Sequence, residues 1–157
     1  MNVDAVRARI RAALQRLEAG VLVCSAACGA DQVALEAAGG LGLTRRVILP
    51  FDESKFRDTS VVDRGVEWGG PFDRMMQELR IANAVITLPG GADDTASYAA
   101  ANLTILDDAQ ALARVVKAAV VAVLVAEGEK AYEGVEGSFA EEAKRRGLPT
   151  VSISTLG

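Results

Sequence analysis

The chain has 157 residues, of which 50% are hydrophobic and 24% charged, and its net charge at pH 7 is −4. This length and balance suit one globular domain over residues 1–157 and exclude a disordered chain. The acidic charge, without a basic stripe, argues against a nucleic-acid partner, and no apolar run approaches the roughly 18 residues of a membrane span. Because the N-terminus lacks the apolar core of a signal peptide, we expect a cytoplasmic protein with no membrane partner.

The chemistry that the chain can carry is limited by its histidines and cysteines. Histidine is absent, and the two cysteines, Cys24 and Cys28, lie close together in the sequence. This composition excludes Ser-His-Asp and Cys-His catalysis and disfavours a zinc site, so we expect no metal and no cofactor. We expect Cys24 to behave as a small buried hydrophobic residue. Cys28 lies near an expected helix start, where a reactive thiolate would be stabilised.

The hydrophobic pattern predicts alternating helices and strands. Apolar residues at helical spacing predict an opening helix over Asp4–Ala19, which Gly20 ends. Short apolar runs without alternation are typical of strands buried on both faces. They lie at Val21–Ser25, Val47–Pro50, Ala84–Leu88, Ala119–Ala126 and Thr150–Ser154. The later helices are expected at Asp31–Leu41, Pro71–Ile81, Tyr98–Ala118 and Glu136–Arg146. The connection Phe51–Gly70 shows no clear periodicity.

This alternation is typical of parallel βαβ units with right-handed crossovers. We therefore predict a Rossmann-like, three-layer α/β domain with about five mostly parallel strands. The expected strand order is 2-1-3-4-5, which places Val21–Ser25 beside Ala84–Leu88. Ligands of such sheets bind at the carboxyl ends of the strands, so the loops after the strands form the candidate site.

The first candidate loop, Ser25–Asp31, reads S-A-A-C-G-A-D. Its small side chains let a ligand approach the backbone, and the N–H groups at Gly29, Ala30 and Asp31 open a helix, where anions bind. Ser25 adds a hydroxyl donor, and the Asp31 carboxylate suits a ribose hydroxyl or a base amine. In the alternative interpretation, Gly29 only makes the turn and Asp31 only caps the helix.

The long second loop follows Pro50 and carries many charges. Arg57 is its best candidate ligand residue, because a guanidinium binds a phosphate through two parallel hydrogen bonds. Ser60 adds a hydroxyl. Trp68 is expected to pack the loop onto the sheet, with base stacking as the alternative. The other charges of this loop are expected to be solvated.

Several of these strings together resemble a known family. S-A-A-C-G-A-D, V-I-L-P-F, K-F-R-D-T-S-V and P-F-D-R-M-M resemble the SLOG superfamily of Rossmann-like domains, which includes the DNA-processing DprA/Smf proteins and the cytokinin-activating LOG proteins. The resemblance covers about Val21–Leu88 and is closest to bacterial SLOG domains attached to signalling proteins. It implies binding of a nucleotide or a nucleotide-derived signal.

The third loop reads L-P-G-G-A-D-D-T-A-S-Y. In LOG proteins the equivalent loop reads P-G-G-x-G-T-x-x-E and wraps a phosphate. The resemblance therefore implies phosphate contacts at Gly90, Gly91 and Thr95, although Thr95 falls one residue late. Tyr98 stands where the catalytic glutamate of the family would fall, which argues against hydrolysis. Alternatively, the glycines form a surface turn and Asp94 or Thr95 caps the next helix.

The sequence thus favours a domain that binds or senses a nucleotide-like small molecule without turning it over. One alternative is a LOG-type nucleotide N-glycosidase or phosphoribohydrolase, for which Asp31, Glu36 and Asp94 are the available carboxylates. The other is a ligand-free interaction module. Apolar residues on more than one side of the helix Tyr98–Ala118, including Leu103 and Ile105, predict a homodimer.

Overall fold

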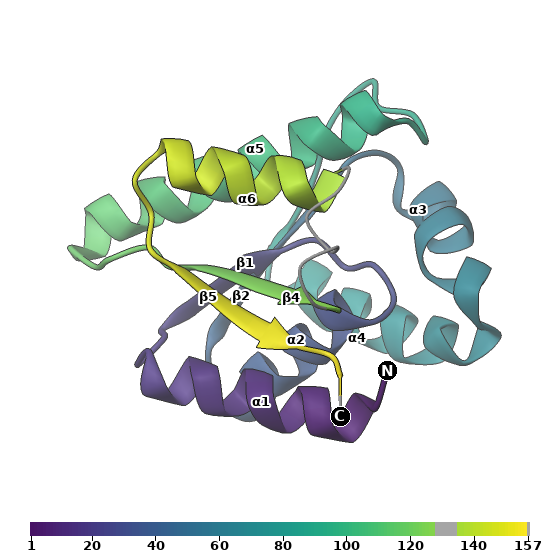
Figure 1. Cartoon of the computed structure of the whole chain (residues 1–157). Helices are drawn as coiled ribbons and strands as arrows, with labels where there is room; N and C mark the ends of the chain where they lie inside the picture. The colour runs from purple at the N-terminus through teal and green to yellow at the C-terminus, as the bar shows by residue number, and fades with distance from the viewer. Residues whose placement is uncertain (128–134, 157) are drawn as a thin grey trace.

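The computed structural model describes residues 1–127 and 135–156 and shows helices alternating with strands (Figure 1). The strands are β1 (Val21–Cys24), β2 (Thr44–Leu49), β3 (Val85–Thr87), β4 (Ala122–Ala126) and β5 (Thr150–Ser154). The helices are α1 (Val3–Arg16), α2 (Ala30–Gly40), α3 (Glu53–Ser60), α4 (Gly69–Ile81), α5 (Thr95–Val116) and α6 (Val135–Arg145). Two short 3-10 helices, η1 (Val62–Arg64) and η2 (Val66–Trp68), join α3 to α4. The five strands and five helices expected from the sequence are confirmed, with bounds that differ by a few residues.

The strands form two small parallel sheets. One sheet has the order β1-β2-β3 and the other pairs β4 with β5. The expected single-sheet order 2-1-3-4-5 is wrong in two places: β2 and not β1 lies between its two neighbours, and β3 does not pair with β4, which lies in a separate sheet. The burial of β2 explains its central place: Val47, Ile48 and Leu49 are fully enclosed, as central-strand residues are, whereas Val21 of β1 is exposed. The direction of each crossover is not encoded in a strand's own sequence, so local pattern does not reveal it.

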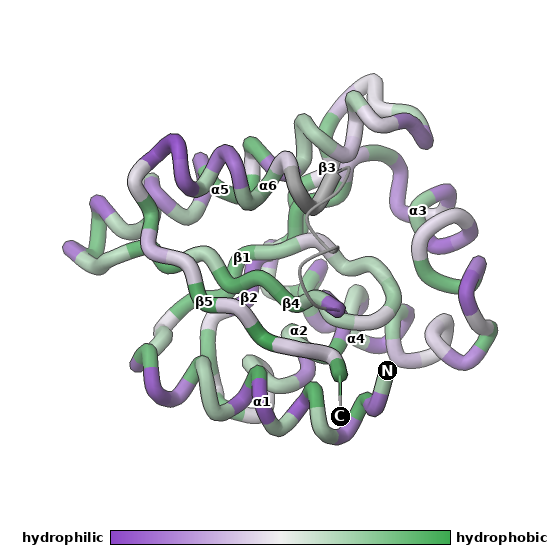
Figure 2. Tube along the Cα trace, in the orientation of Figure 1, coloured by the Kyte–Doolittle hydropathy of each residue, from purple (hydrophilic) through white to green (hydrophobic). Residues whose placement is uncertain are grey.

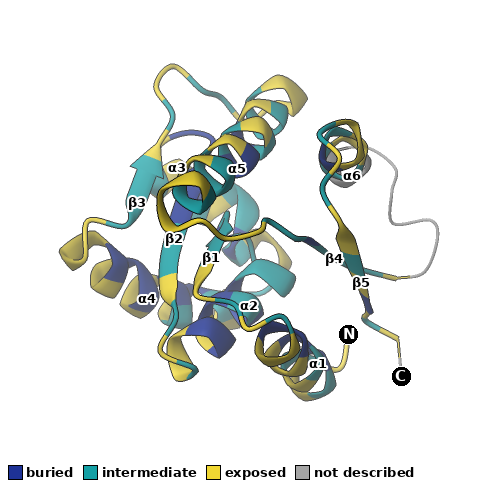
Figure 3. Ribbon diagram, turned by 90° about the vertical axis from the view of Figure 1, so that its left-hand side faces the viewer, coloured by how far each residue is buried: buried dark blue, intermediate teal, exposed yellow. Residues whose placement is uncertain are grey.

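Helices cover both sides of the strands (Figures 1 and 3). On one side lie α1, α2 and α4, and on the other lie α5 and α6. Successive residues of β2 alternate between the two sides, as a pleated strand requires. Val47 and Leu49 pack with Phe72 and Met76 of α4, whereas Ile48 packs with Ile105 of α5. Hydrophobic residues accordingly concentrate along the strands and on the inner helix faces (Figure 2).

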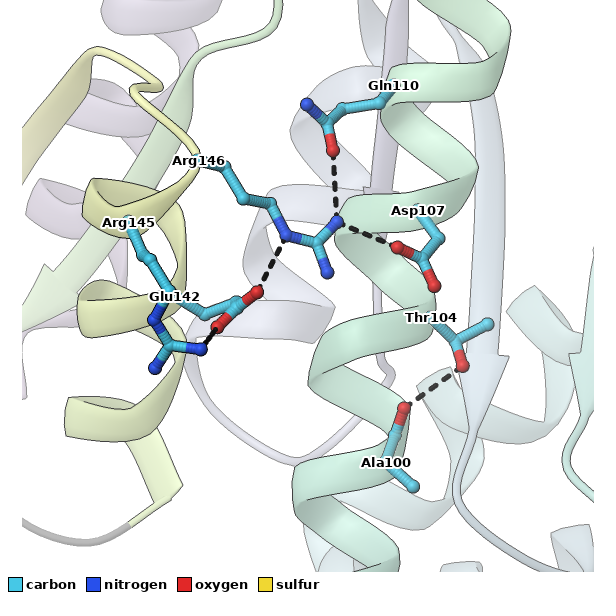
Figure 4. A network of polar contacts seen from close by, with 7 residues as sticks. All are labelled: Ala100, Thr104, Asp107, Gln110, Glu142, Arg145 and Arg146. Carbon is cyan, nitrogen blue, oxygen red and sulfur yellow. Dashed lines mark hydrogen bonds and ion pairs between the residues drawn. The ribbon is translucent and has the colours of Figure 1, made fainter.

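The second sheet is joined to the rest of the molecule from both sides. Ile153 of β5 belongs to the core that α1 and α2 form through Ile10 and Val33. On the opposite side, Arg146 ties the end of α6 to α5 (Figure 4). Its guanidinium donates to the Glu142 carboxylate at 2.9 Å and to Asp107 at 2.7 Å. These contacts hold the two sheets in one body.

Two large apolar residues of α5, Ile105 and Leu106, are buried inside the chain. Ile105 packs on β2, and Leu106 packs in a separate core with Ala122 of β4 and residues of α6. This covering by α6 accounts for apolar residues on two sides of α5. Leu103 and Val116 remain 43% and 64% exposed. The homodimer stays a prediction, which light scattering at high protein concentration would test.

The long connection after β2 is helical, which corrects its interpretation as a segment without periodicity. Asp52 caps α3 by accepting a hydrogen bond from the backbone N–H of Lys55 at 3.1 Å. Phe56 is the one buried residue of this eight-residue helix, so no repeating pattern could reveal it. Trp68 packs against two cores, the one between β2 and α4 and the one that α1 and α2 form with β5. This agrees with the packing role expected for it. None of the described helices is long and apolar enough to cross a membrane.

Candidate functional site

The loops that follow β1, β2 and β3 are joined at Ser60, the last residue of α3. The backbone N–H of Cys28 in the first loop donates to the carbonyl of Ser60 at 2.9 Å. The Ser60 hydroxyl oxygen lies 2.7 Å from the phenol oxygen of Tyr98 in the first turn of α5. The phenol in turn donates to the Asp93 carboxylate of the third loop at 3.0 Å. The carboxyl edge of the three-stranded sheet therefore carries one connected polar network.

The first loop turns at Gly29 and leads directly into α2. Gly29 has φ +92°, a conformation that side-chain-bearing residues rarely adopt, and no side chain caps the helix that follows. The backbone N–H groups of Gly29 and Ala30 have no hydrogen-bond acceptor among the described residues. The Asp31 carboxylate instead accepts from the backbone N–H of Ala27 at 3.2 Å, which closes the loop. Asp31 thus has a structural contact beside any role toward a ligand.

The thiols of Cys24, the last residue of β1, and of Cys28 in the first loop are held in their protonated form. Burial raises the pKa of Cys24 well above its ordinary value, and the nearby Asp31 carboxylate adds to the rise. Although Cys24 as a residue is only half-buried, its side chain packs against the core. Burial also raises the pKa of Cys28, with Asp63 adding to the rise and Arg64 opposing it. The stabilised thiolate considered for Cys28 from its position near a helix start is therefore not found. Ser25 is half-buried just after β1.

Arg57 is held on the side of α4. Its Nε and one terminal nitrogen donate to the two carboxylate oxygens of Asp73 at 2.8 and 2.9 Å. The guanidinium also fills the space over Gly69, where an added Cβ would lie 2.6 Å from it. In the described part of the chain, no hydrogen bond or ion pair joins Arg57 to the first loop. Ser60 reaches the junction of the loops, whereas Arg57 ties α3 to α4.

The third loop is fixed by its own backbone. Gly90 has φ +70°, and Gly91 lies so close to β2 that an added Cβ would be 1.9 Å from the carbonyl oxygen of Pro50. Asp94 caps α5 by accepting from the backbone N–H of Ser97 at 2.7 Å, and this bond lowers the pKa of Asp94. The capping interpretation of Asp94 is thus confirmed. Thr95, which follows it, is exposed in the first turn of α5.

Aromatic residues that the sequence did not mark as site residues lie beside this network. The ring of Tyr98 packs edge-on against Phe51, with ring centroids 5.7 Å apart. The ammonium of Lys55 lies 5.7 Å from the centroid of the same Phe51 ring. Burial raises the pKa of Tyr98, and the hydrogen bond with Ser60 opposes the rise. The available signal was the position of Tyr98 in the first turn of the helix that follows the third loop.

Two hollows of the structure lie away from these loops. One of about 320 Å³ lies between α2 and α4, and one of about 300 Å³ lies at the amino ends of β2 and β3. Arg45 and Glu78, which form an ion pair at 3.2 Å, line both. No residue of the three loops lines either hollow. Within residues 1–127 and 135–156, no three acidic or cysteine side chains gather as metal ligands would.

No protein-family model, curated protein or solved structure matches this chain. The similarity to the SLOG superfamily rests on the motifs quoted above. What that similarity implies about ligands belongs to the proposal that follows.

Proposed function

We propose that this chain is a Rossmann-like domain of the SLOG kind that binds a nucleotide-like small molecule at the carboxyl edge of β1, β2 and β3. The observation that carries the proposal is the junction at Ser60. Its backbone carbonyl bonds to the first loop, and its hydroxyl bonds to the first turn after the third loop. A ligand that displaces one loop therefore changes the hydrogen bonds of the others, as a sensing domain requires.

The first loop supplies the chemistry that a phosphate prefers. The backbone N–H groups of Gly29 and Ala30 lie at the positive end of α2, an 11-residue helix, and have no acceptor within the described residues. The Ser25 hydroxyl is a further donor, whereas the Ser60 hydroxyl donates to Tyr98 and lies beside the site. Gly90 and Thr95 lie at the edge of the third loop, where they are exposed. The Asp31 carboxylate, which accepts from the Ala27 N–H, repels a phosphate and would sit closer to a ribose hydroxyl or a base amine of the ligand.

The distribution of carboxylates favours binding over turnover. General acid–base catalysis needs a carboxyl group positioned at the reacting bond. Asp31 accepts from the loop backbone, Asp94 caps α5, and Glu36 is paired with Arg7 at 3.1 Å. At the position where the family's glutamate would fall, the raised pKa of Tyr98 keeps the phenol protonated at neutral pH. We therefore prefer a sensor over an N-glycosidase.

A thermal-shift screen with nucleoside monophosphates, diphosphates and cyclic nucleotides tests this proposal, combined with an assay for base release. We expect at least one nucleotide to raise the melting temperature without release of its base. Base release would identify the enzyme instead. If no nucleotide raises the melting temperature and no base is released, the ligand-free interaction module is favoured and the proposal is overturned.

A pair of glycine variants locates the site. Gly29→Val places a β-branched side chain at φ +92° in the first loop, which strains the turn and blocks the approach to the N–H groups. Gly42→Val is the matched control, because Gly42 has φ +73° but lies at the amino end of β2. We expect both variants to lose stability and only Gly29→Val to lose nucleotide binding. A folded Gly29→Val variant that binds as the parent does would move the site away from the first loop.

A further inference from the structure

Gln32 has a buried amide without a partner. It is 1% exposed and is the one polar residue in the core formed by the described residues. Neither its side-chain nitrogen nor its side-chain oxygen has a hydrogen-bond partner in the described part of the chain. Buried polar groups in native proteins are nearly always hydrogen-bonded, so this exception calls for an explanation.

An apolar residue would suit this position better in the unliganded protein. Leu35, three residues further along the same face of α2, is fully buried in an apolar core, which is the environment that an aliphatic side chain prefers. A buried amide without a partner loses its bonds to water and gains nothing in return. Buried polar groups without a hydrogen-bond partner are expected at functional sites, where a ligand supplies the missing partner.

The amide belongs to the end of α2 that faces the first loop. Gln32 is the third residue of α2, and helical side chains lean back over the turn on their N-terminal side. That turn is the one that Gly29 opens without a side-chain cap and where Gly29 and Ala30 have unused N–H groups. Two independent features, unused backbone donors and an unpartnered amide, therefore occur at the same helix end.

We propose that Gln32 binds the base of the nucleotide, through a base edge that carries both an amine and a ring nitrogen. This inference rests on the proposed nucleotide site. A glutamine amide presents one acceptor and one donor side by side, which match the amine and ring nitrogen of adenine or cytosine. Asp31 in the same helical turn favours an edge with an amine, because its carboxylate attracts donors and repels acceptors.

The base reaches Gln32 when the first loop opens, since the amide is shielded from solvent in the closed form. Two hydrogen bonds that hold this loop closed are Cys28 N–H to the Ser60 carbonyl and Ala27 N–H to Asp31. Opening breaks the bond to Ser60, the residue whose hydroxyl contacts Tyr98. Occupation of the base site is thereby transmitted to the third loop.

The test is the variant Gln32→Met, which keeps the size of the side chain and removes the amide. The matched control is Gln77→Met on α4, where the glutamine is exposed. For Gln32→Met we expect a melting temperature higher by about 2–8 °C, because an unsatisfied buried group is removed. We expect its affinity for adenosine monophosphate, measured by titration calorimetry, to fall roughly tenfold or more. Gln77→Met should change neither quantity.

A second ligand tests whether the Gln32 amide contacts the amine of the base. Purine riboside monophosphate lacks the amine of adenosine monophosphate, so the parent chain should bind it more weakly, and in Gln32→Met the difference between the two affinities should shrink to what Asp31 alone contributes. A lower melting temperature for Gln32→Met would mean that the amide already has a partner, such as a buried water, and would overturn the inference. Unchanged adenosine monophosphate affinity would overturn it as well, while leaving the nucleotide site intact. If the parent binds no nucleotide, the proposed function itself fails.

Discussion

The hydroxyl oxygen of Ser60 lies 2.7 Å from the phenol oxygen of Tyr98, a residue 38 positions later in the chain. The phenol has a single proton and donates it to Asp93, so Ser60 is the donor in its bond with Tyr98. The Ser60 carbonyl also accepts from the backbone N–H of Cys28. Ser60 is therefore hydrogen-bonded both to the first loop and to the first turn of α5, which follows the third loop. We therefore expect a displacement of one of the three loops to displace the other two.

Removing the phenol hydroxyl tests this cooperation. Tyr98→Phe keeps the ring against Phe51 and removes the bonds to Ser60 and Asp93, so it should lower the free energy of unfolding by about 1–3 kcal/mol. Ser60→Ala removes only the bond to Tyr98 and should cost about 1 kcal/mol. The double variant should cost less than the sum, because both changes remove the same bond. Urea denaturation measures all three, and strictly additive losses would show that the bond does not stabilise the fold.

The third loop offers a sharper contrast between two adjacent glycines. Gly91→Ala would place a Cβ 1.9 Å from the Pro50 carbonyl oxygen, so the loop must move away from β2. Gly90→Ala meets no neighbour and costs only the left-handed backbone conformation at φ +70°. We expect a loss of roughly 1–2 kcal/mol for Gly90→Ala and a larger loss for Gly91→Ala. Chemical denaturation of the pair decides the order, and a smaller loss for Gly91→Ala would contradict the close approach.

The alternation of strands and helices could be predicted from the sequence because their periodicity is local. The run Val47–Leu49 is apolar on both faces and indeed lies in the middle of its sheet, enclosed by helices on both sides. The position of β2 between β1 and β3 could not be predicted, because it depends on the direction in which each crossover returns. Helix α3 was missed because Phe56 alone is buried in it.

The candidate site stays a prediction, and its contacts could be foreseen only in part. The three loops are linked through Ser60 and not through direct adjacency of β1 and β3. Gly91 was interpreted through its resemblance to a phosphate loop, whereas the structure gives it a steric reason in the approach to Pro50. The unpartnered amide of Gln32 could not be recognised from sequence, since the absence of a partner is a property of the folded chain alone.

Variants of Arg57 and of its partner Asp73 test whether Arg57 binds the ligand or only stabilises the fold. Asp73 accepts from two of its nitrogens, and the hydrogen bond raises the pKa of Arg57 and lowers that of Asp73. The pair is exposed, so Arg57→Ala and Asp73→Ala should each cause only a small loss of stability. We expect both variants to keep the parent's nucleotide affinity, measured by calorimetry. A drop of roughly tenfold in Arg57→Ala alone would instead place the guanidinium on the ligand.

The buried thiol of Cys24 predicts how stability depends on pH. Its folded-state pKa is raised well above the ordinary value, first by burial and then by Asp31. In the unfolded chain the thiol loses its proton near its ordinary pKa, about 8.5, while the folded chain still holds it. The unfolded state therefore binds fewer protons above that pH, and the free energy of unfolding falls as pH rises, by at most about 1.4 kcal/mol per pH unit from this group.

The measurement is urea denaturation between neutral pH and the region where tyrosines begin to ionise. The parent should lose stability steadily above about pH 8.5, and Cys24→Ala should show a shallower decline whatever its stability at neutral pH. Cys28→Ala serves as the comparison. Its thiol is less enclosed, and Arg64 opposes the rise in its pKa, so we expect it to change the slope less. An equally steep decline in Cys24→Ala would mean that the Cys24 thiol is not the group responsible.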